Sequence, residues 1–269
     1  MRFLPAILLG RFVRVLVRLV RPGGGSALPG LVVSKVAPGL LAATLSKFSD
    51  GLIVVTGSAG KSTTTKMLVG IARAHGKTVF TNPSTANIAQ GFFSSIIEQS
   101  DIFGRIKGDV AILEMDEGHA EEITRLIRPK QVTILNVLED QLDRFVDPAV
   151  VRDKLAQVAR RAKDTVLLNA DDQNTLIINR DVQHLGTKWF GITGSLLSDA
   201  KHGLGTAPTY EAKIARPIPS AEVMSVDGLR ASVVLSGAVT EVELPNRGLH
   251  FALDAIAALQ SAEAYLGAD

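Results

Sequence analysis

The 269-residue chain has no cysteine, which excludes disulfides and any metal held by thiolates. The five histidines show no paired spacing, so we expect no zinc site. The net charge is only +2, with basic and acidic residues interleaved along most of the sequence. This balance gives no support for nucleic acid as a partner. The missing thiols fit a reducing compartment, and we expect a cytoplasmic protein.

The sequence also lacks an uninterrupted apolar stretch at its N-terminus, where Arg11, Arg14 and Arg18 divide the apolar residues. A membrane span or a signal peptide is therefore poorly supported. The spacing places the three arginines on one face of a helix. Two interpretations stay open: a basic amphipathic helix on the inner face of a membrane, or a helix that docks on its own domain. The following segment, RPGGGSALPG (residues 21–30), is expected to end the helix, so residues 1–45 are predicted to form an N-terminal helix and linker.

From residue 52 onward, apolar β-branched runs alternate with helical periodicity. Runs that are apolar on both faces and separated by helices are typical of a parallel sheet covered on each side. The sequence therefore predicts an α/β domain over residues 46–269, with a mostly parallel sheet and helices on both faces. Strands are expected in residues 52–57, 77–82, 108–117, 130–140 and 164–172, and helices in 61–74, 121–127 and 147–162.

The pattern changes after Trp189, where short runs suggest a small antiparallel region at about residues 205–245. The closing helix is predicted over residues 248–266. The runs in the antiparallel region are EAKIA (211–215), AEVMSV (221–226), RASVVLS (230–236) and TEVELP (240–245).

The motif Gly-Ser-Ala-Gly-Lys-Ser (57–62) lies between the first predicted strand and the first helix of this domain. Backbone N–H groups and the helix dipole can hold phosphate oxygens in that setting. Lys61 would reach the terminal phosphates, and the Ser62 hydroxyl would ligate magnesium. The loop is shorter than the common G-x-x-x-x-G-K-[ST] form, whose first glycine would fall at Val55. Even so, its context favours a nucleotide site over a chance match.

Polar residues follow the predicted strands that neighbour this loop. Each carboxylate alone is compatible with a solvated loop, but the carboxyl ends of parallel strands meet at one edge, where a metal or nucleotide site is expected. Asn169, Asp171 and Asp172 also end a strand, and a ribose contact and a structural turn are equally open for them. The polar groups near the loop are NPSTANIAQG (82–91), Glu114, Asp116, Glu117, Glu139, Asp140, Asp143 and Arg144.

The short G-[ST]-x-G-K-[ST]-T-T loop, an N-x-x-x-x-N turn, a strand ending in Glu and N-x-x-x-D-x-L-D-R together resemble the Mur ligases. Within that family, the motifs are most similar to those of the ligase subunit of lipid II isoglutaminyl synthase. The resemblance extends to LLNADD, WFGI, RPIP and LPNRGLHFALDAIAAL. It implies a Mur-ligase central domain that uses ATP and Mg²⁺. It also implies a C–N ligase of peptidoglycan and cell-wall synthesis, which amidates D-glutamate in the stem of lipid II through an acyl phosphate. The implied partners are a lipid-linked precursor and a GatD-like glutamine amidotransferase that supplies ammonia.

The resemblance assigns roles to individual positions of this sequence. It implies catalytic roles for Lys61, Glu114 and Asp140, and magnesium ligation by Ser62 and Glu114. The implied nucleotide contacts are Gly57, Ser58, Gly60, Lys61, Ser62, Thr63, Asn87 and Asn136.

Several positions depart from the family pattern. No cysteines of a zinc ribbon precede RPIP, Gln141 stands where most relatives have His, and Phe251 and Asp254 occupy places where the family has Asn. The chain also stops where the family's C-terminal domain would begin. These departures leave an alternative open: a truncated homologue that binds nucleotide, or acts as a scaffold, without turnover.

Overall fold

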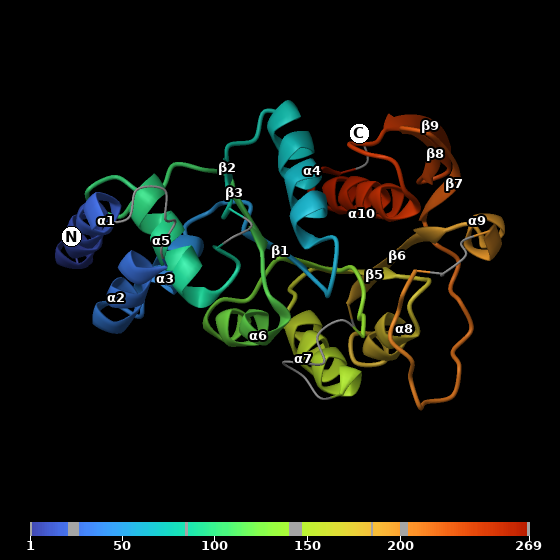
Figure 1. The fold of residues 1–269 in the computed structure, drawn as a ribbon, viewed down its shortest axis with the longest axis horizontal. Helices are drawn as coiled ribbons and strands as arrows, with labels where there is room; N and C mark the ends of the chain where they lie inside the picture. Colours follow the sequence, from blue (N-terminus) through green and yellow to red (C-terminus); the bar gives the residue numbers. More distant parts are fainter. Residues whose placement is uncertain are drawn as a thin grey trace.

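The computed structural model describes residues 2–20, 27–83, 86–139, 147–183, 185–199 and 204–267. Their centre is a nine-stranded sheet in the order β2-β3-β1-β4-β5-β6-β7-β8-β9 (Figure 1). Neighbours from β2 to β7 are parallel, and β8 is antiparallel to both of its neighbours, β7 and β9. The strands are β1 (Leu52–Thr56), β2 (Val79–Phe80), β3 (Val110–Glu114), β4 (Gln131–Ile134), β5 (Thr165–Asn169), β6 (Gly186–Ile192), β7 (Ala221–Asp227), β8 (Arg230–Leu235) and β9 (Ala238–Glu243).

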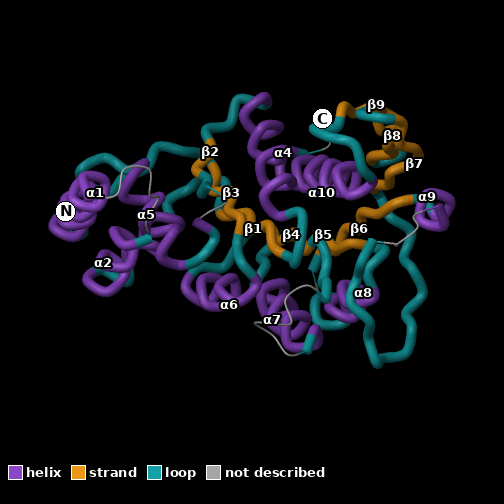
Figure 2. Tube along the Cα trace, in the orientation of Figure 1, coloured by secondary structure: helices purple, strands orange, loops and turns teal. Residues whose placement is uncertain are grey.

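Helices cover both faces of the sheet, as predicted (Figure 2). One face carries α4 (Lys61–Ala74) and α10 (Leu249–Leu266), which pack against each other. The opposite face carries α6 (Glu117–Leu126), α7 (Pro148–Arg160) and α8 (Gln173–Asn179). The first four strands of the parallel region are fully buried, which explains why β1, β2 and β3 are mainly apolar without alternation. In β4, Gln131 and Thr133 are polar and form buried hydrogen bonds with Ser261 of α10. A short helix, α9 (Gly194–Asp199), follows β6.

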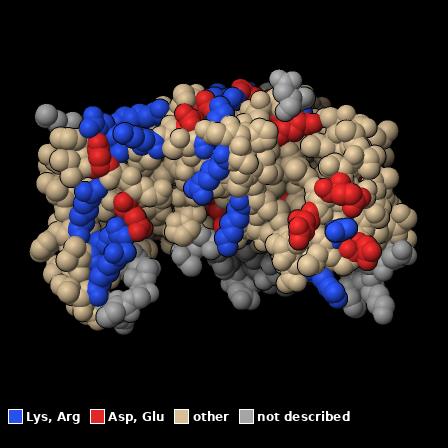
Figure 3. All heavy atoms as spheres, turned by 90° about the horizontal axis from the view of Figure 1, so that it is seen from above, with Lys and Arg blue, Asp and Glu red and all other residues tan. Residues whose placement is uncertain are grey.

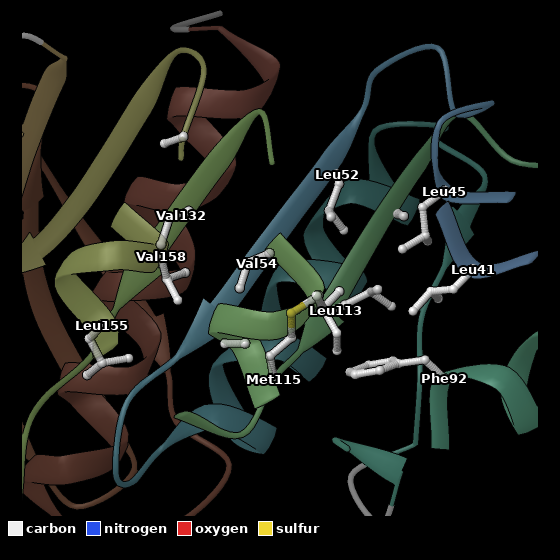
Figure 4. Packing of buried hydrophobic residues seen from close by; sticks show 14 of the residues in the cluster. Leu41, Leu45, Leu52, Val54, Phe92, Leu113, Met115, Val132, Leu155 and Val158 are labelled. Atoms are coloured by element: carbon white, nitrogen blue, oxygen red, sulfur yellow. The ribbon is translucent and has the colours of Figure 1, made fainter. Parts of the chain in front are cut away.

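Four helices gather at the β2 end of the sheet: α1 (Leu4–Val20), α2 (Leu28–Val36), α3 (Leu40–Leu45) and α5 (Ala89–Gln99). Their apolar side chains join the core beneath the sheet, so this end packs as part of the α/β body. Figure 4 shows Phe92 of α5 beside Leu113 of β3 and Met115, with Leu41 and Leu45 of α3 close by.

The helix expected over residues 61–74 is confirmed, and α7 and α10 match their predictions closely. The helix expected over 121–127 begins earlier, at Glu117. Asp116 explains the difference, because its side chain accepts a hydrogen bond from the N–H of Gly118 at 3.0 Å and so caps the first turn.

The predicted strand EAKIA (211–215) is wrong, because this segment is irregular. Its backbone is bound by a side chain instead of a neighbouring strand. Ile214 donates to Gln173 Oε1 at 2.9 Å, and Gln173 Nε2 donates to the Ile214 carbonyl at 3.0 Å. The other three predicted runs correspond to β7, β8 and β9.

The expected linker over residues 21–30 is wrong at its C-terminal end, because α2 begins at Leu28 with Pro29 in its first turn. Gly30 lies where α2 crosses α5, and its N–H donates to Ser94 Oγ at 3.0 Å. A Cβ at this position would overlap the backbone carbonyl oxygen of Gln90. Gly30 is therefore a close-packing residue in a helix.

Helix α1 docks on the domain through α2 and α5. Gly10 permits the close approach, since a Cβ there would lie 2.7 Å from side-chain atoms of both Val33 and Ile97. Of the two interpretations of this helix, docking is therefore observed. Among the described residues, no helix combines the length and apolar character needed to cross a bilayer.

Candidate nucleotide site

The loop after β1 reverses direction through two glycines. Gly57 has φ 128° and Gly60 has φ 84°, values that residues with a Cβ rarely adopt. Gly57 also lies against the neighbouring strand end, where a Cβ would be 3.0 Å from the backbone N and O of Asn136. Helix α4 then begins at Lys61, so its free N–H groups face the loop. The geometry is that of an anion-binding loop.

Asn136 follows β4 and holds the loop in place. Its side chain accepts from the Ala59 N–H at 2.9 Å and donates to the Ala59 carbonyl at 3.2 Å. Its backbone carbonyl accepts from the Ser58 N–H at 3.0 Å. Ser58 Oγ in turn accepts from the Leu138 N–H at 2.9 Å. These contacts show how Asn136 and Ser58 shape the predicted site.

Lys61 bends back over the loop that precedes it. Its ammonium donates to the carbonyls of Gly57 at 2.5 Å and Ser58 at 2.8 Å, and it pairs with Glu117 Oε1 at 3.3 Å. Glu117 is fully buried, and this burial raises its pKa, with the Lys61 charge acting in the opposite direction. Glu117 belongs to the acidic cluster seen in the sequence, but its pairing with Lys61 requires the fold.

Ser62 and Glu114, which the resemblance implies as magnesium ligands, lie within hydrogen-bond distance of each other. Ser62 Oγ donates to Glu114 Oε2 at 2.8 Å, and Asn87 Nδ2 donates to Glu114 Oε1 at 3.3 Å. A hydroxyl and a carboxylate beside a phosphate loop suit Mg²⁺, which prefers oxygen ligands and is completed by phosphates and water. The donor set fits the ion.

Asn82 fixes Glu114 from behind and was not singled out as a site residue. Its side chain accepts from the Glu114 N–H at 3.0 Å and donates to the Glu114 carbonyl at 3.1 Å. It is the first asparagine of the N-x-x-x-x-N turn, so the motif itself held the signal. Only the second, Asn87, was assigned a role.

Asp254 of α10 lies directly against the loop. A Cβ on Gly60 would overlap its Oδ1 atom, and the residue is only 7% exposed. Burial raises its pKa to about 7, and the hydroxyl of Thr64 opposes that shift only in part. This carboxyl is therefore close to half-protonated at neutral pH, next to the place where phosphates would bind.

Thr63 and Asp140 are the remaining residues predicted near the loop. Thr63 lies in the first turn of α4, next to Ser62. Asp140 and its neighbour Gln141 fall outside the described residues, so the catalytic role of Asp140 stays a prediction. No group of three His, Cys, Asp or Glu side chains able to hold a metal occurs in the part of the chain that the structure describes.

Asn169, Asp171 and Asp172 have structural contacts. Asn169 Nδ2 donates to the Leu135 carbonyl at 3.0 Å, and Asp172 accepts from the Val137 N–H at 2.6 Å. Asp172 also caps α8, and burial raises its pKa to about 6. Asp171 pairs with Arg216 at 2.6 Å. These contacts support the structural-turn interpretation of the three residues.

The Mur ligase middle domain family matches residues 55–262. This chain belongs to the Mur ligase family. A curated relative is the MurT subunit of lipid II isoglutaminyl synthase (glutamine-hydrolyzing) from Streptococcus pneumoniae, 33% identical over 57% of this chain and 34% of the relative. The Staphylococcus aureus MurT subunit is 30% identical over 64% of this chain and 38% of the relative. The chain thus spans little more than a third of these relatives.

Solved Mur ligases share the fold at low identity. MurF from Thermotoga maritima in complex with ADP superposes with a TM-score of 0.67 and 19% identity, covering 88% of this chain and 50% of MurF. The D-alanyl-D-alanyl-adding ligase from Acinetobacter baumannii gives a TM-score of 0.66 and 18% identity, covering 90% of this chain and 48% of that enzyme. Both confirm the predicted fold class.

Proposed function

We propose that this chain is the nucleotide-binding part of an ATP-dependent C–N ligase of peptidoglycan precursor synthesis. The observation that carries the proposal is the Ser62–Glu114 pair beside Lys61, at the end of a glycine loop that opens a helix. These groups supply one cation and one magnesium site for a triphosphate. The membership in the Mur ligase family supports ligase chemistry over simple hydrolysis.

The proposed reaction has two steps. A substrate carboxylate attacks the terminal phosphorus of ATP, which forms an acyl phosphate and releases ADP. Ammonia then attacks the acyl carbon, phosphate leaves with the electron pair of the broken C–O bond, and a proton is lost as the amide forms. Magnesium, when bound, offsets phosphate charge.

The chain's own residues would prepare the first step. Lys61 would exchange its contacts with the Gly57 and Ser58 carbonyls for phosphate oxygens and stabilise the charge of the transferred group. Ser62 and Glu114 would hold the ion, with Asn87 and Asn82 orienting Glu114. Asp140 is proposed to act at the same edge of the sheet.

The substrate and the partner are proposed from the MurT relatives. The name of those relatives describes a glutamine-hydrolysing synthase that acts on lipid II. We propose the D-glutamate carboxyl of a lipid-linked stem peptide as acceptor, and a GatD-like glutaminase as the source of ammonia. A place in the cytoplasm, at the inner face of the membrane, follows from such a substrate.

Asp254 supports a second candidate function, a nucleotide-binding or scaffold protein without turnover. Its carboxylate form would lie beside the loop that receives phosphates, and like charges repel. If that charge prevents closure of the site around Mg-ATP, binding to a partner is the remaining role.

Calorimetry of Mg-ATP binding tests the nucleotide site. Lys61→Gln removes the charge while keeping a hydrogen-bond donor, and we expect the affinity to fall by roughly 10- to 100-fold. Lys66→Gln is the matched control, because Lys66 is exposed on the same helix. Equal affinities for the wild type and Lys61→Gln would contradict the site, provided that melting curves show both proteins folded.

Amide formation distinguishes the two functions. The chain is mixed with a separately supplied Mur-ligase C-terminal domain, a GatD-like glutaminase, glutamine, Mg-ATP and a stem peptide that carries D-glutamate. The product is measured by mass spectrometry. The ligase proposal expects a product about 1 Da lighter than the acid, because NH₂ replaces OH. Tight Mg-ATP binding without amide or ADP would favour the scaffold.

A further inference from the structure

The charge of the chain is divided unequally along its length. Seven basic residues and no acidic residue precede Asp50, so the remaining 220 residues hold 22 basic and 27 acidic residues. Figure 3 shows Lys and Arg side chains gathered over the end of the molecule that carries α1. The overall charge of +2 therefore hides a basic end on an acidic body.

Arg11 and Arg14 of α1 bind α5 and hold the helix on the domain, and Arg18 lies at the exposed edge of this contact. Arg11 donates to the carbonyls of Ile97 and Ser100, at the end of α5. Arg14 pairs with Glu98, and Arg18 lies 3.9 Å from the same carboxylate. Arg11 and Arg14 therefore bind one side of this helix to its own protein.

One apolar face of α1 is turned outward, while Ala6, Ile7 and Gly10 are buried against the domain. At 100° per residue, Leu8, Phe12, Val15 and Leu19 form one stripe, and the arginines lie along one edge of it. Phe12 is 61% exposed and Leu19 is 75% exposed. An unbroken apolar surface of this kind is unusual on a soluble monomer and marks an interaction site. The exposed large apolar residues of this end are Leu8, Leu9, Phe12, Val15, Leu16, Leu19 and Val20 of α1, Leu28 and Val36 of α2, and Ile102 and Phe103 after α5.

We propose that this apolar face of α1 lies on an anionic lipid surface, with the α/β body on the water side. Apolar insertion and basic charge are the two signals that an interfacial helix combines. Arg2, Arg18 and Lys35 are exposed at the basic end and available to lipid phosphates. An anionic surface attracts this end and repels the acidic body, which fixes the orientation.

The charge pattern favours lipid over a protein partner. A protein surface carries both signs and would be matched by mixed charges, whereas the first 49 residues carry only positive ones. Figure 1 places α1 at one end of the molecule and β7–β9 at the other, so contact through α1 leaves the phosphate loop in the middle uncovered. The lipid-binding surface of α1 does not depend on the proposed function. Contact with lipid through α1 would bring the phosphate loop close to a lipid-linked substrate.

Vesicle sedimentation with the full 269-residue chain tests the proposal. Vesicles of phosphatidylcholine alone are compared with vesicles containing about one quarter phosphatidylglycerol, a charged fraction that attracts basic segments. We expect wild type to partition at least about tenfold more strongly to the anionic vesicles, with weakening in high salt. The double variant Phe12→Ser/Leu19→Ser should lose about tenfold or more of that partitioning.

The control is Ile218→Ser/Val239→Ser, which removes two exposed apolar side chains away from α1 and should bind as wild type does. Melting curves establish that all variants are folded, which is expected because the changed side chains are exposed. Three results would overturn the proposal: no wild-type binding to anionic vesicles, equal binding by Phe12→Ser/Leu19→Ser, or equal binding to neutral vesicles. If the wild type formed a dimer but bound no vesicles, and Phe12→Ser/Leu19→Ser were monomeric, the apolar face of α1 would be assigned to a second copy of the chain.

The same variants separate this surface from the nucleotide site. Mg-ATP affinity should be unchanged in Phe12→Ser/Leu19→Ser, since α1 lies at one end of the molecule, away from the start of α4 where the phosphate loop ends (Figure 1). Vesicle binding without Mg-ATP binding would defeat the proposed function and leave the lipid surface standing. The reverse result would defeat only the lipid surface.

Discussion

The phosphate loop and the α1 surface use charge in opposite ways. At the loop, Lys61, Glu114, Glu117 and Asp254 are all wholly or largely buried from water, in contact with one another or with backbone groups. At α1, the arginines are bound to α5 while apolar side chains face the solvent.

The difference indicates what each region is built to meet. Buried charge is costly unless it is paired or becomes paired by a ligand, so the loop is organised for a charged ligand. Exposed apolar surface is costly in water, so the α1 face is organised for an apolar one. The four predictions below test this contrast, beginning with the largest expected effect.

Asp254→Asn tests the cost of the buried charge. Because the folded pKa of about 7 is above the ordinary value of 3.8, the folded state holds its proton more tightly than the unfolded state does. Wild-type stability should therefore fall as the pH rises from 4 to 7 and level off above that. The variant should lack this loss, a difference of up to roughly 4 kcal/mol above pH 7. Chemical denaturation at several pH values measures it.

Asp227→Asn is the control for that series, because Asp227 is exposed at the end of β7. If the free energy of unfolding changed with pH in parallel for wild type and Asp254→Asn, burial of the Asp254 carboxyl would have no cost to stability. Asp254→Asn should also bind Mg-ATP more tightly than the wild type at pH 8, since it removes a negative charge from beside Gly60.

Glu114→Gln tests the metal site at the loop. The amide keeps an acceptor for Ser62 but loses the charge that a divalent ion needs. We expect the magnesium-dependent part of nucleotide affinity to fall by about 100-fold, roughly 2.7 kcal/mol. Titrations of ATP with and without Mg²⁺ measure it. If nucleotide affinity kept its dependence on magnesium in this variant, Glu114 would not be a ligand of the ion.

Gly30→Ala tests the docking of the N-terminal helices. The added methyl would overlap the Gln90 carbonyl, so α2 must move off α5, at a cost of about 1–3 kcal/mol. Gly70→Ala in α4 is the matched change, because nothing lies within 4 Å of its Cβ position. It should stabilise the protein by up to about 1 kcal/mol. Equal melting temperatures for both variants would contradict the close crossing.

Arg18→Ala should have the smallest effect on stability. Its guanidinium lies 3.9 Å from Glu98 and is 65% exposed, so water and salt screen the pair. We expect a loss below about 0.5 kcal/mol in denaturation experiments. A loss above 1 kcal/mol would mean that Arg18 holds α1 more firmly than its exposure indicates.

Local patterns were sufficient for much of the fold. The strand–loop–helix unit around Gly57 and Lys61 is contiguous, so one window of sequence contains both the motif and its context. The short helices α2, α3, α5, α8 and α9 were not predicted, because their formation depends on packing more than on their own periodicity. EAKIA was predicted as a strand from composition, but Gln173 satisfies its backbone instead.

The site was predictable as a set of residues and not as a set of contacts. The family resemblance named Ser62 and Glu114 together as magnesium ligands, and the structure brings them within hydrogen-bond distance. Their binding of the ion stays a prediction. The bond between Lys61 and Glu117 joins residues that are 56 positions apart, and Asp254 reaches Gly60 from the last helix. No local pattern encodes such distances.

The sequence by itself determined the phosphate loop and the parallel sheet, because these depend on short-range spacing and on burial of apolar runs. It indicated the family through the resemblance of its motifs. Only the tertiary structure decided which face of α1 meets the solvent. An amphipathic helix has two faces, and its periodicity is the same whichever one packs inward. Ala6, Ile7 and Gly10 form the packed face, and the acceptors on α5 bind Arg11 and Arg14 at its side. The apolar stripe that includes Phe12 and Leu19 was left outside.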